Sequence, residues 1–304
     1  MKVLVTGGAG FLGSHVADAL SEAGHLVTVF DLRESPYIRE DQKMVTGDLL
    51  DQEVLDRLVE GHEAVYHFAG IADIDECSER PVDTVRYNVL GTVMLLEACR
   101  KAGVKRFIFA SSAYVFSNSG LFYRSSKQAC ESFIHDYAEK YDLKYTCLRY
   151  GSLFGERADA RNSIYRLLKQ ALETGRIVYA GSGKEVREFI HVRDAAASSV
   201  EILEPEFENQ HIVLTGAEKI TYADLLAMIN EILSNRIEIV MQPSSRKEHY
   251  GLTPYNFSPR LGRKLINNPH IDMGQGLLQC IADLYEQIHR NSHETFGLLV
   301  DDSN

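Results

Sequence analysis

The chain has 304 residues, of which 45% are hydrophobic and 25% charged, and it carries a formal net charge of -11 at pH 7. A chain of this length can bury a large core in one or two domains, and the composition is that of an ordinary globular protein. The negative charge argues against nucleic acid or an anionic membrane surface as the main partner. No apolar run approaches the ~18 residues that span a bilayer, and the chain begins directly with a strand, so we expect a cytoplasmic protein without a secretory signal.

The cysteines and histidines show no spacing that is typical of a metal site. The five cysteines are odd in number, none forms a Cys-x-x-Cys pair, and the 11 histidines include no His-Glu-x-x-His. We therefore expect buried, reduced thiols and no metal ion. The cysteines are Cys77, Cys99, Cys130, Cys147 and Cys280.

The first chemical motif is a glycine-rich turn between a short apolar strand and an amphipathic helix. Gly8-x-Gly10-x-x-Gly13 fits the dinucleotide fingerprint, and Gly7-x-x-Gly10-x-x-Gly13 fits a known variant of it. Such glycines allow a tight turn, a close approach of backbone N–H groups to a pyrophosphate, and close packing of helix on strand. The helix N-terminus adds a positive dipole end. The motif predicts dinucleotide binding, against the alternative of a glycine turn that binds nothing. The residues expected to contact the dinucleotide here are Gly7, Gly10, Phe11, Leu12 and Gly13.

A second apolar strand over 26–30 ends in Asp31, which lies where an acidic residue accepts hydrogen bonds from the adenosine ribose. A carboxylate at this position would repel a 2′-phosphate. We therefore expect NAD rather than NADP, although Arg33 nearby argues in the opposite direction.

Apolar strands alternate with helical patterns through the first half of the chain. Repeated strand–helix alternation predicts an α/β protein with a Rossmann-type, doubly wound parallel sheet covered by helices on both faces. The expected strands are 3–5, 26–30, 44–49, 63–70, 106–112 and 145–150, and the expected helices after the first are 51–60, 81–102 and 124–140.

The second half is less regular and predicts a smaller, mixed α/β substrate domain. We expect residues 1–160, with returning segments at about 188–216, to form the NAD-binding domain, and 161–187 with 217–304 to form the substrate-binding domain. The expected helices are 163–174, one from about Asp194, 222–234 with Thr221 as its N-cap, and 275–290; the expected strands are 189–192 and 211–216. The tail from Ser292 is expected to be poorly ordered.

Three side chains can meet beyond the carboxyl ends of the strands, where the reacting site of an open α/β sheet lies. Ser112 ends the strand 106–112, and Tyr123 and Lys127 form a Tyr-x-x-x-Lys pair on one face of a helix. A nearby ammonium and a positive nicotinamide ring both favour the phenolate form of a tyrosine. Tyr123 is therefore predicted to be the general base, Lys127 to activate it and hold the nicotinamide ribose, and Ser112 to bind the substrate oxygen. The alternative is that Tyr123 and Lys127 are simply packed neighbours.

Further stretches complete a recognisable pattern. They are Thr6 to Gly13, Gly47-Asp48-Leu49, His67-Phe68-Ala69-Gly70, Asn88-Val89-Leu90-Gly91-Thr92, Ser111-Ser112-Ala113, Leu148-Arg149-Tyr150 and Arg187 to Asp194. With Tyr123 and Lys127, this pattern resembles the NAD-dependent epimerase/dehydratase family of extended short-chain dehydrogenases/reductases, which includes UDP-glucose 4-epimerase. The resemblance covers nearly the whole chain.

The resemblance implies roles that the residues alone do not. It implies that Asp48 and Leu49 contact adenine and that Asn88 supports the strand and helix beneath the active site. Three further residues would line the cofactor cleft, namely Phe68, Ala69 and Gly70.

The resemblance also implies a nucleotide-sugar substrate and a partner copy. Arg187 and Arg246 occupy positions where the family binds the substrate diphosphate, and a guanidinium suits that role because it binds phosphate oxygens in a bidentate manner. The alternative for each arginine is a surface salt bridge. The family commonly forms a homodimer, here through the helices 88–102 and 124–140.

Two departures from the family pattern bear on the substrate. Only ten residues separate Ser112 from Tyr123, so the sugar pocket should be more open or differently lined. Ala113-Tyr114 replaces the acid pair of 4,6-dehydratases, which makes dehydration less favoured, and Ser152 replaces a common asparagine. The leading hypothesis is a nucleotide-sugar epimerase, most simply at C4, with bound NAD. The alternatives are a net NAD-dependent oxidoreductase, a dehydratase or decarboxylase, and a non-catalytic NAD-binding protein.

Overall fold

The computed structural model describes residues 1–243, and a seven-stranded sheet forms its largest element. The strand order is β11-β6-β5-β4-β1-β2-β3, and every pairing is parallel. The predicted doubly wound parallel sheet is therefore confirmed. The strands are β1 (Lys2–Thr6), β2 (Leu26–Asp31), β3 (Lys43–Thr46), β4 (Ala64–His67), β5 (Arg106–Ser112), β6 (Lys144–Tyr150) and β11 (Gln210–Leu214).

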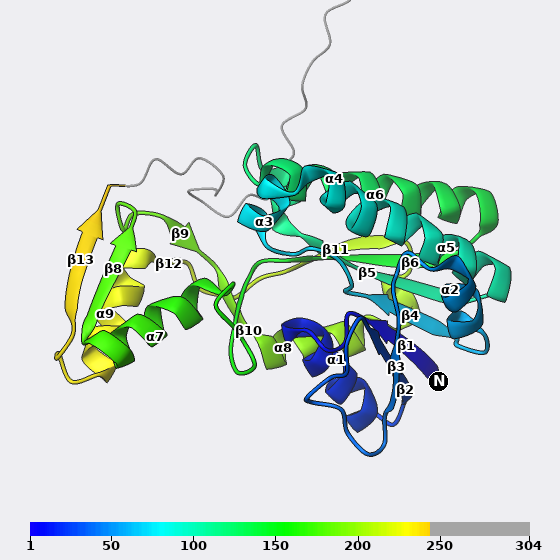
Figure 1. Cartoon of the computed structure of the whole chain (residues 1–304), viewed down its shortest axis with the longest axis horizontal. Helices are drawn as coiled ribbons and strands as arrows, with labels where there is room; N and C mark the ends of the chain where they lie inside the picture. The colour runs from blue at the N-terminus through cyan, green and yellow to red at the C-terminus, as the bar shows by residue number, and fades with distance from the viewer. Residues whose placement is uncertain (244–304) are drawn as a thin grey trace, which may run out of the picture. The chain divides into compact units, whose positions relative to one another are not determined.

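Helices cover both faces of this sheet (Figure 1). One face packs against α2 (Gln52–Val59), α5 (Gly91–Ala102) and α6 (Leu121–Tyr141), with Leu4 and Phe107 in its core. The other packs against α1 (Phe11–Glu22) and α8 (Val192–Glu201), with Val5 and Ile108 in its core. Successive residues of β1 and β5 thus point to opposite faces, and both are apolar because both faces are buried.

A separate hydrophobic cluster lies in the second half of the chain. Here α7 (Ser163–Thr174) and α9 (Tyr222–Ile232) pack around Ile177 and Leu226 beside the parallel pair β8 (Arg176–Ala180) and β13 (Glu238–Gln242). Two further small sheets pair β7 (Ser152–Phe154) with β10 (Phe189–His191) and β9 (Val186–Arg187) with β12 (Ile220–Thr221). The division into domains proposed from the sequence stays a prediction.

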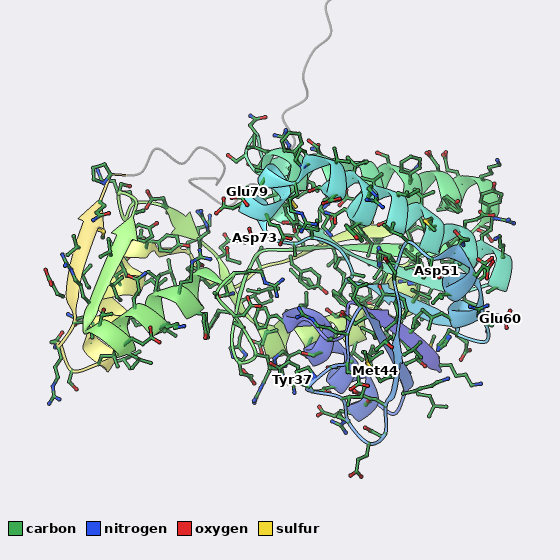
Figure 2. All side chains as sticks on the ribbon, viewed as in Figure 1. Tyr37, Met44, Asp51, Glu60, Asp73 and Glu79 are labelled. Carbon is green, nitrogen blue, oxygen red and sulfur yellow. The ribbon has the colours of Figure 1, made fainter. Side chains whose placement is uncertain are left out.

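Side-chain caps explain why several helices begin where they do. Asp51 and Asp73, both labelled in Figure 2, accept hydrogen bonds from the Val54 and Glu76 N–H groups at the starts of α2 and α3 (Ile74–Glu79). Thr221 accepts from Asp224 N–H at 3.0 Å, which confirms the N-cap that the sequence predicts for α9.

The predicted helix over 81–102 contains an irregular turn. The structure divides it into α4 (Pro81–Thr84), the π-helical turn η1 (Val85–Leu90) and α5. A π-turn widens the helix locally, and such turns are often found at functional sites. Asn88 lies within η1.

Some expectations fall outside the described residues. These are Arg246, Cys280, the helix expected at 275–290 and the tail from Ser292. Among residues 1–243 no helix combines the length and the apolar character needed to cross a membrane.

Candidate active site

The glycine loop joins the end of β1 to the start of α1, and it is packed too closely for a side chain at Gly7 or, in the first turn of α1, at Gly13. Gly7 has a φ of +74°, and a Cβ atom there would lie 2.5 Å from the Ala69 nitrogen. A Cβ at Gly13 would lie 2.3 Å from the Gly7 carbonyl oxygen. The first N–H groups of a helix have no partner within the helix, and the N-cap of α1 is Gly10, whose lack of a side chain leaves them uncovered from that position. The start of α1 therefore presents backbone donors to an anion.

Asp31 is held against this loop. Its Oδ2 accepts a hydrogen bond from the Ala9 N–H at 3.1 Å, so the acidic group at the end of β2 has a fixed place beside the glycine turn. Asp48 is exposed and accepts from the Leu50 N–H at 2.9 Å, whereas Leu49 is buried in the core beside Gly91.

The segment after β4 is fastened by Asn88. The Asn88 Oδ1 accepts from the Ile71 N–H at 2.7 Å, and its Nδ2 donates to the Ile71 carbonyl and to Ser126 Oγ, each at 3.0 Å. A Cβ at Gly70 would lie 2.7 Å from the Asn88 oxygen, so a residue with a side chain at position 70 would collide with Asn88. The half-buried ring of Phe68, just before, packs on Tyr66 and Tyr150.

The predicted Tyr–Lys pair lies on one face of α6, next to β5. Lys127 is buried, and its Nζ donates to the Ala110 carbonyl of β5 at 2.8 Å and lies 5.8 Å from the centre of the Tyr123 ring. Burial lowers the pKa of Lys127. Ser112, two residues after Ala110, is buried, and its Oγ accepts from the Tyr114 N–H.

The backbone of Tyr123 is tied to Asn88. Ser126 Oγ donates to the Tyr123 carbonyl at 2.8 Å and accepts from Asn88 Nδ2. The side-chain amide of Asn88 therefore links two segments. One is the segment after β4, which would face a cofactor, and the other is the first turn of α6, which carries the predicted base Tyr123.

Comparison with known proteins decides the family. Residues 3–215, more than half of the chain, match the model of the NAD dependent epimerase/dehydratase family. The chain belongs to this family. It is 27% identical over 301 residues to a putative UDP-glucose 4-epimerase of Methanocaldococcus jannaschii, covering 92% of this chain and 97% of that protein.

Two further comparisons extend this result. The chain is 26% identical over 310 residues to a UDP-N-acetyl-alpha-D-glucosaminuronate decarboxylase of Bacillus cytotoxicus, covering 92% of this chain and 96% of that one. Its structure matches that of Thermus thermophilus UDP-glucose 4-epimerase in complex with NAD, with a TM-score of 0.75, 27% identity and coverage of 85% and 91% of the two chains. The resemblance that the sequence motifs indicated is confirmed.

The residues present fit the family's cofactor, NAD. Gly7 and Gly13 let the turn pack closely on the segment after β4 and on the start of α1, whose N-cap, Gly10, has no side chain to cover the first N–H groups. The Asp31 carboxylate stands beside this turn, where it can accept hydrogen bonds from ribose hydroxyls. Lys127 and Tyr123 lie near the carboxyl end of β5, where this family's sheet topology directs a ligand.

The family match leaves one buried ion pair to be explained, because sequence reasoning gave Glu131 no role. Glu131 lies one turn after Lys127 and accepts from Ser111 Oγ at 2.6 Å and from Arg149 at 3.0 and 2.7 Å. Burial alone would raise the pKa of Glu131, but hydrogen bonds from His211, Arg149 and Ser111 outweigh it and lower the pKa to about 2. The pair fastens α6 to β5 and β6. The signal that the sequence offered for Glu131 was its position four residues after Lys127, which places both side chains on the same face of the helix.

The same pair bears on the predicted absence of a metal. Glu131, Cys147 and His211 have possible ligand atoms within 4.8 Å of one another. Arg149, however, donates to both Glu131 oxygens, and a guanidinium there opposes a cation electrostatically. The sequence expectation of no metal stays a prediction.

Arg187, predicted to bind the substrate diphosphate, is buried on β9. Its Nη1 donates to the Val186 carbonyl at 2.9 Å, and its guanidinium lies 5.7 Å from the centre of the Tyr222 ring. The roles of Arg187 and of the other site residues in this family member stay predictions.

The cysteines have the surroundings that the sequence suggests. In the part of the chain that the structure describes, all four cysteines are buried and have free thiols. Burial raises the pKa of Cys99 and Cys147, which makes reactive thiolates unfavourable there.

Proposed function

We propose that this chain is a nucleotide-sugar epimerase that inverts C4 through reversible oxidation of the sugar. The observation that carries the proposal is the placement of Tyr123 and Lys127 on one face of α6 against β5, next to Ser112. Relatives that span nearly the whole chain, among them a putative UDP-glucose 4-epimerase, support the substrate class. NAD, when bound, supplies the group that accepts and returns a hydride.

The chain's own residues account for the proton and the orientation. Ser112 Oγ would hold the C4 oxygen, and Tyr123 would remove the hydroxyl proton as the C–H bond at C4 breaks. The Lys127 ammonium favours the phenolate form of Tyr123 electrostatically. When hydride returns to the opposite face of the 4-keto sugar, Tyr123 would give the proton back. Arg187 and Arg246 would hold the diphosphate while the sugar turns.

The test is Tyr123→Phe, which removes the hydroxyl and keeps the ring. We expect kcat/KM for C4 epimerisation of UDP-sugars to fall by about 10²- to 10⁴-fold, while NAD remains bound in wild-type amount. Tyr141→Phe, at an exposed position of the same helix, is the matched control and should leave turnover unchanged. Wild-type turnover by Tyr123→Phe would refute the assignment of the base.

A decarboxylase is the second candidate, because a relative of that activity aligns over 92% of the chain. The same site would oxidise C4 of a nucleotide-linked uronic acid, and the resulting 4-keto group would ease loss of the C5 carboxylate as CO₂. Release of CO₂ from UDP-glucuronate would support this candidate, and formation of the C4 epimer alone would exclude it.

We also propose that the enzyme works as a cytoplasmic homodimer. Large apolar side chains remain exposed on η1 and α6, among them Leu90, Phe122 and Phe133. Such side chains favour a protein contact over solvent. The buried, free thiols suit a reducing compartment. Sedimentation of the purified protein as a monomer at micromolar concentration would contradict the dimer.

A further inference from the structure

A second phenol lies against the proposed base. Tyr114 is the second residue after Ser112, in the short turn η2 (Ala113–Phe116). Its ring packs edge-to-face on the ring of Tyr123, with centroids 6.1 Å apart and planes at 83°. None of the steps proposed above uses Tyr114.

The backbone and ring of Tyr114 are held on several sides. Its N–H donates to Ser112 Oγ at 3.3 Å, and its carbonyl accepts from the Ser117 N–H at 2.9 Å. A Cβ at Gly120, whose φ is +89°, would lie 2.6 Å from Tyr114 Cδ1. The ring therefore fills the space between Gly120 and Tyr123.

The turn that carries Tyr114 is fastened to its surroundings. Gln128 Nε2 donates to the Val115 carbonyl at 2.8 Å, and Arg124 Nη1 donates to the Ser117 carbonyl at 3.2 Å. The Arg149 guanidinium lies 4.5 Å from the centre of the Phe116 ring. With only ten residues between Ser112 and Tyr123, the connection has little slack. Tyr114 is thus held in place against the ring of Tyr123.

We propose that Tyr114 determines which sugars the site accepts, by limiting the substituent that C5 carries beside the reacting C4. This inference rests on the proposed function. If Ser112 and Tyr123 both reach the C4 oxygen, groups on the neighbouring carbons come closest to the Tyr114 ring. C5 carries only hydrogen in a pentopyranose, a hydroxymethyl group in a hexose and a carboxylate in a uronic acid. An aromatic wall excludes bulk and disfavours a desolvated carboxylate. The expected order is therefore pentose, then hexose, then uronate.

The experiment measures kcat/KM for C4 epimerisation of UDP-xylose, UDP-glucose and UDP-glucuronate. Wild-type enzyme should prefer UDP-xylose. Tyr114→Thr should raise the ratio of UDP-glucose to UDP-xylose by on the order of tenfold or more, the size of effect that a change in pocket volume produces. Tyr114→Phe keeps the ring and should keep the wild-type ratio. Tyr141→Thr, at an exposed position, is the control and should also keep it.

Three results would overturn the proposal: a wild-type preference for UDP-glucose or UDP-glucuronate over UDP-xylose, an unchanged ratio in an active Tyr114→Thr, or a changed ratio in Tyr114→Phe. The wild-type and Tyr114→Phe results can each overturn the proposal even if Tyr114→Thr does not fold. Failure of the wild type to epimerise any of the three sugars refutes the C4-epimerase function itself. The ratio of UDP-glucose to UDP-xylose can be measured only in an active enzyme. The failure of this proposal is therefore distinguishable from the failure of the C4-epimerase function.

Discussion

His67 is a buried histidine whose hydrogen bonds define its tautomer. Thr92 Oγ1 donates its single proton to the Asn88 carbonyl at 2.5 Å, so at 2.9 Å from His67 Nε2 it must accept. The proton of His67 is thus on Nε2, and Nδ1 accepts from Thr6 Oγ1 at 2.7 Å. Burial, with a smaller contribution from the Lys127 charge, lowers the pKa of His67 to about 3. The neutral ring connects Thr6, the last residue of β1, to Thr92 in the first turn of α5.

This pKa predicts a dependence of stability on pH. Between pH 6.5 and about 3 the unfolded chain binds a proton at His67 that the folded chain does not, so the contribution of His67 to stability falls as the pH falls. His67→Gln removes that dependence. In urea unfolding from pH 7.5 to 4.5, the free energy of unfolding of the variant should fall less steeply than that of wild type, by up to about 1.4 kcal/mol per pH unit.

His135→Gln is the control for this comparison, because His135 is an exposed histidine of α6. Its curve should run parallel to that of wild type. If His67→Gln also ran parallel to wild type, the lowered pKa of His67 in the folded chain would be wrong.

At the residue scale, sequence reasoning predicts well which residues lie together where a motif is local, while the roles of the site residues stay predictions. The glycine loop, Tyr123 with Lys127, and the Thr221 cap each depend on neighbours within a few residues, and the structure brings each set together. The role of His67 could not be foreseen, because its partners Thr6 and Thr92 lie 61 and 25 residues away along the chain.

At the scale of elements, α6 carries two kinds of surface. One face directs Lys127 and Glu131 to β5 and β6, and another leaves Phe133 exposed to 40%. If α6 forms the proposed dimer interface, a charge at Phe133 should prevent association, because an unpaired carboxylate is costly to bury. We expect Phe133→Glu to sediment as a monomer at micromolar concentrations at which wild type is a dimer.

Leu172→Glu provides the matched control. Leu172 is exposed to 73% on α7, outside the proposed interface, so the same substitution there should leave the dimer intact. A dimeric Phe133→Glu, or dissociation by both substitutions, would contradict the assignment of the interface to α6.

Element prediction was most successful where hydrophobic periodicity is strong. The helix predicted at 163–174 matches α7, and the predicted strands of the first half correspond to β1 to β6. The π-turn η1 was not predicted, because Val85 and Val89 keep helical spacing through it. β8 and β13 were missed as well, since each needs its partner 62 residues away to form a ladder.

At the scale of the whole molecule, composition and family resemblance predict the class of protein, whereas the residues of the site indicate the reaction. The seven-stranded sheet presents the glycine loop, Asn88 and the Tyr123–Lys127 pair from separate segments of the chain. The substrate's identity is harder to predict from sequence, because in our proposal it depends on Tyr114. The contact of Tyr114 with the Tyr123 ring is visible only in the folded structure.

The central claim is that C4 is oxidised and reduced again on the same enzyme molecule. It is tested most directly with a UDP-sugar deuterated at C4, followed by mass spectrometry and NMR of the product and by measurement of absorbance at 340 nm. The account predicts the C4 epimer with deuterium retained at C4 and no net accumulation of reduced nucleotide in solution. A ketose or other oxidised product with stoichiometric reduced nucleotide, or an epimer that has exchanged its deuterium for solvent hydrogen, would contradict it.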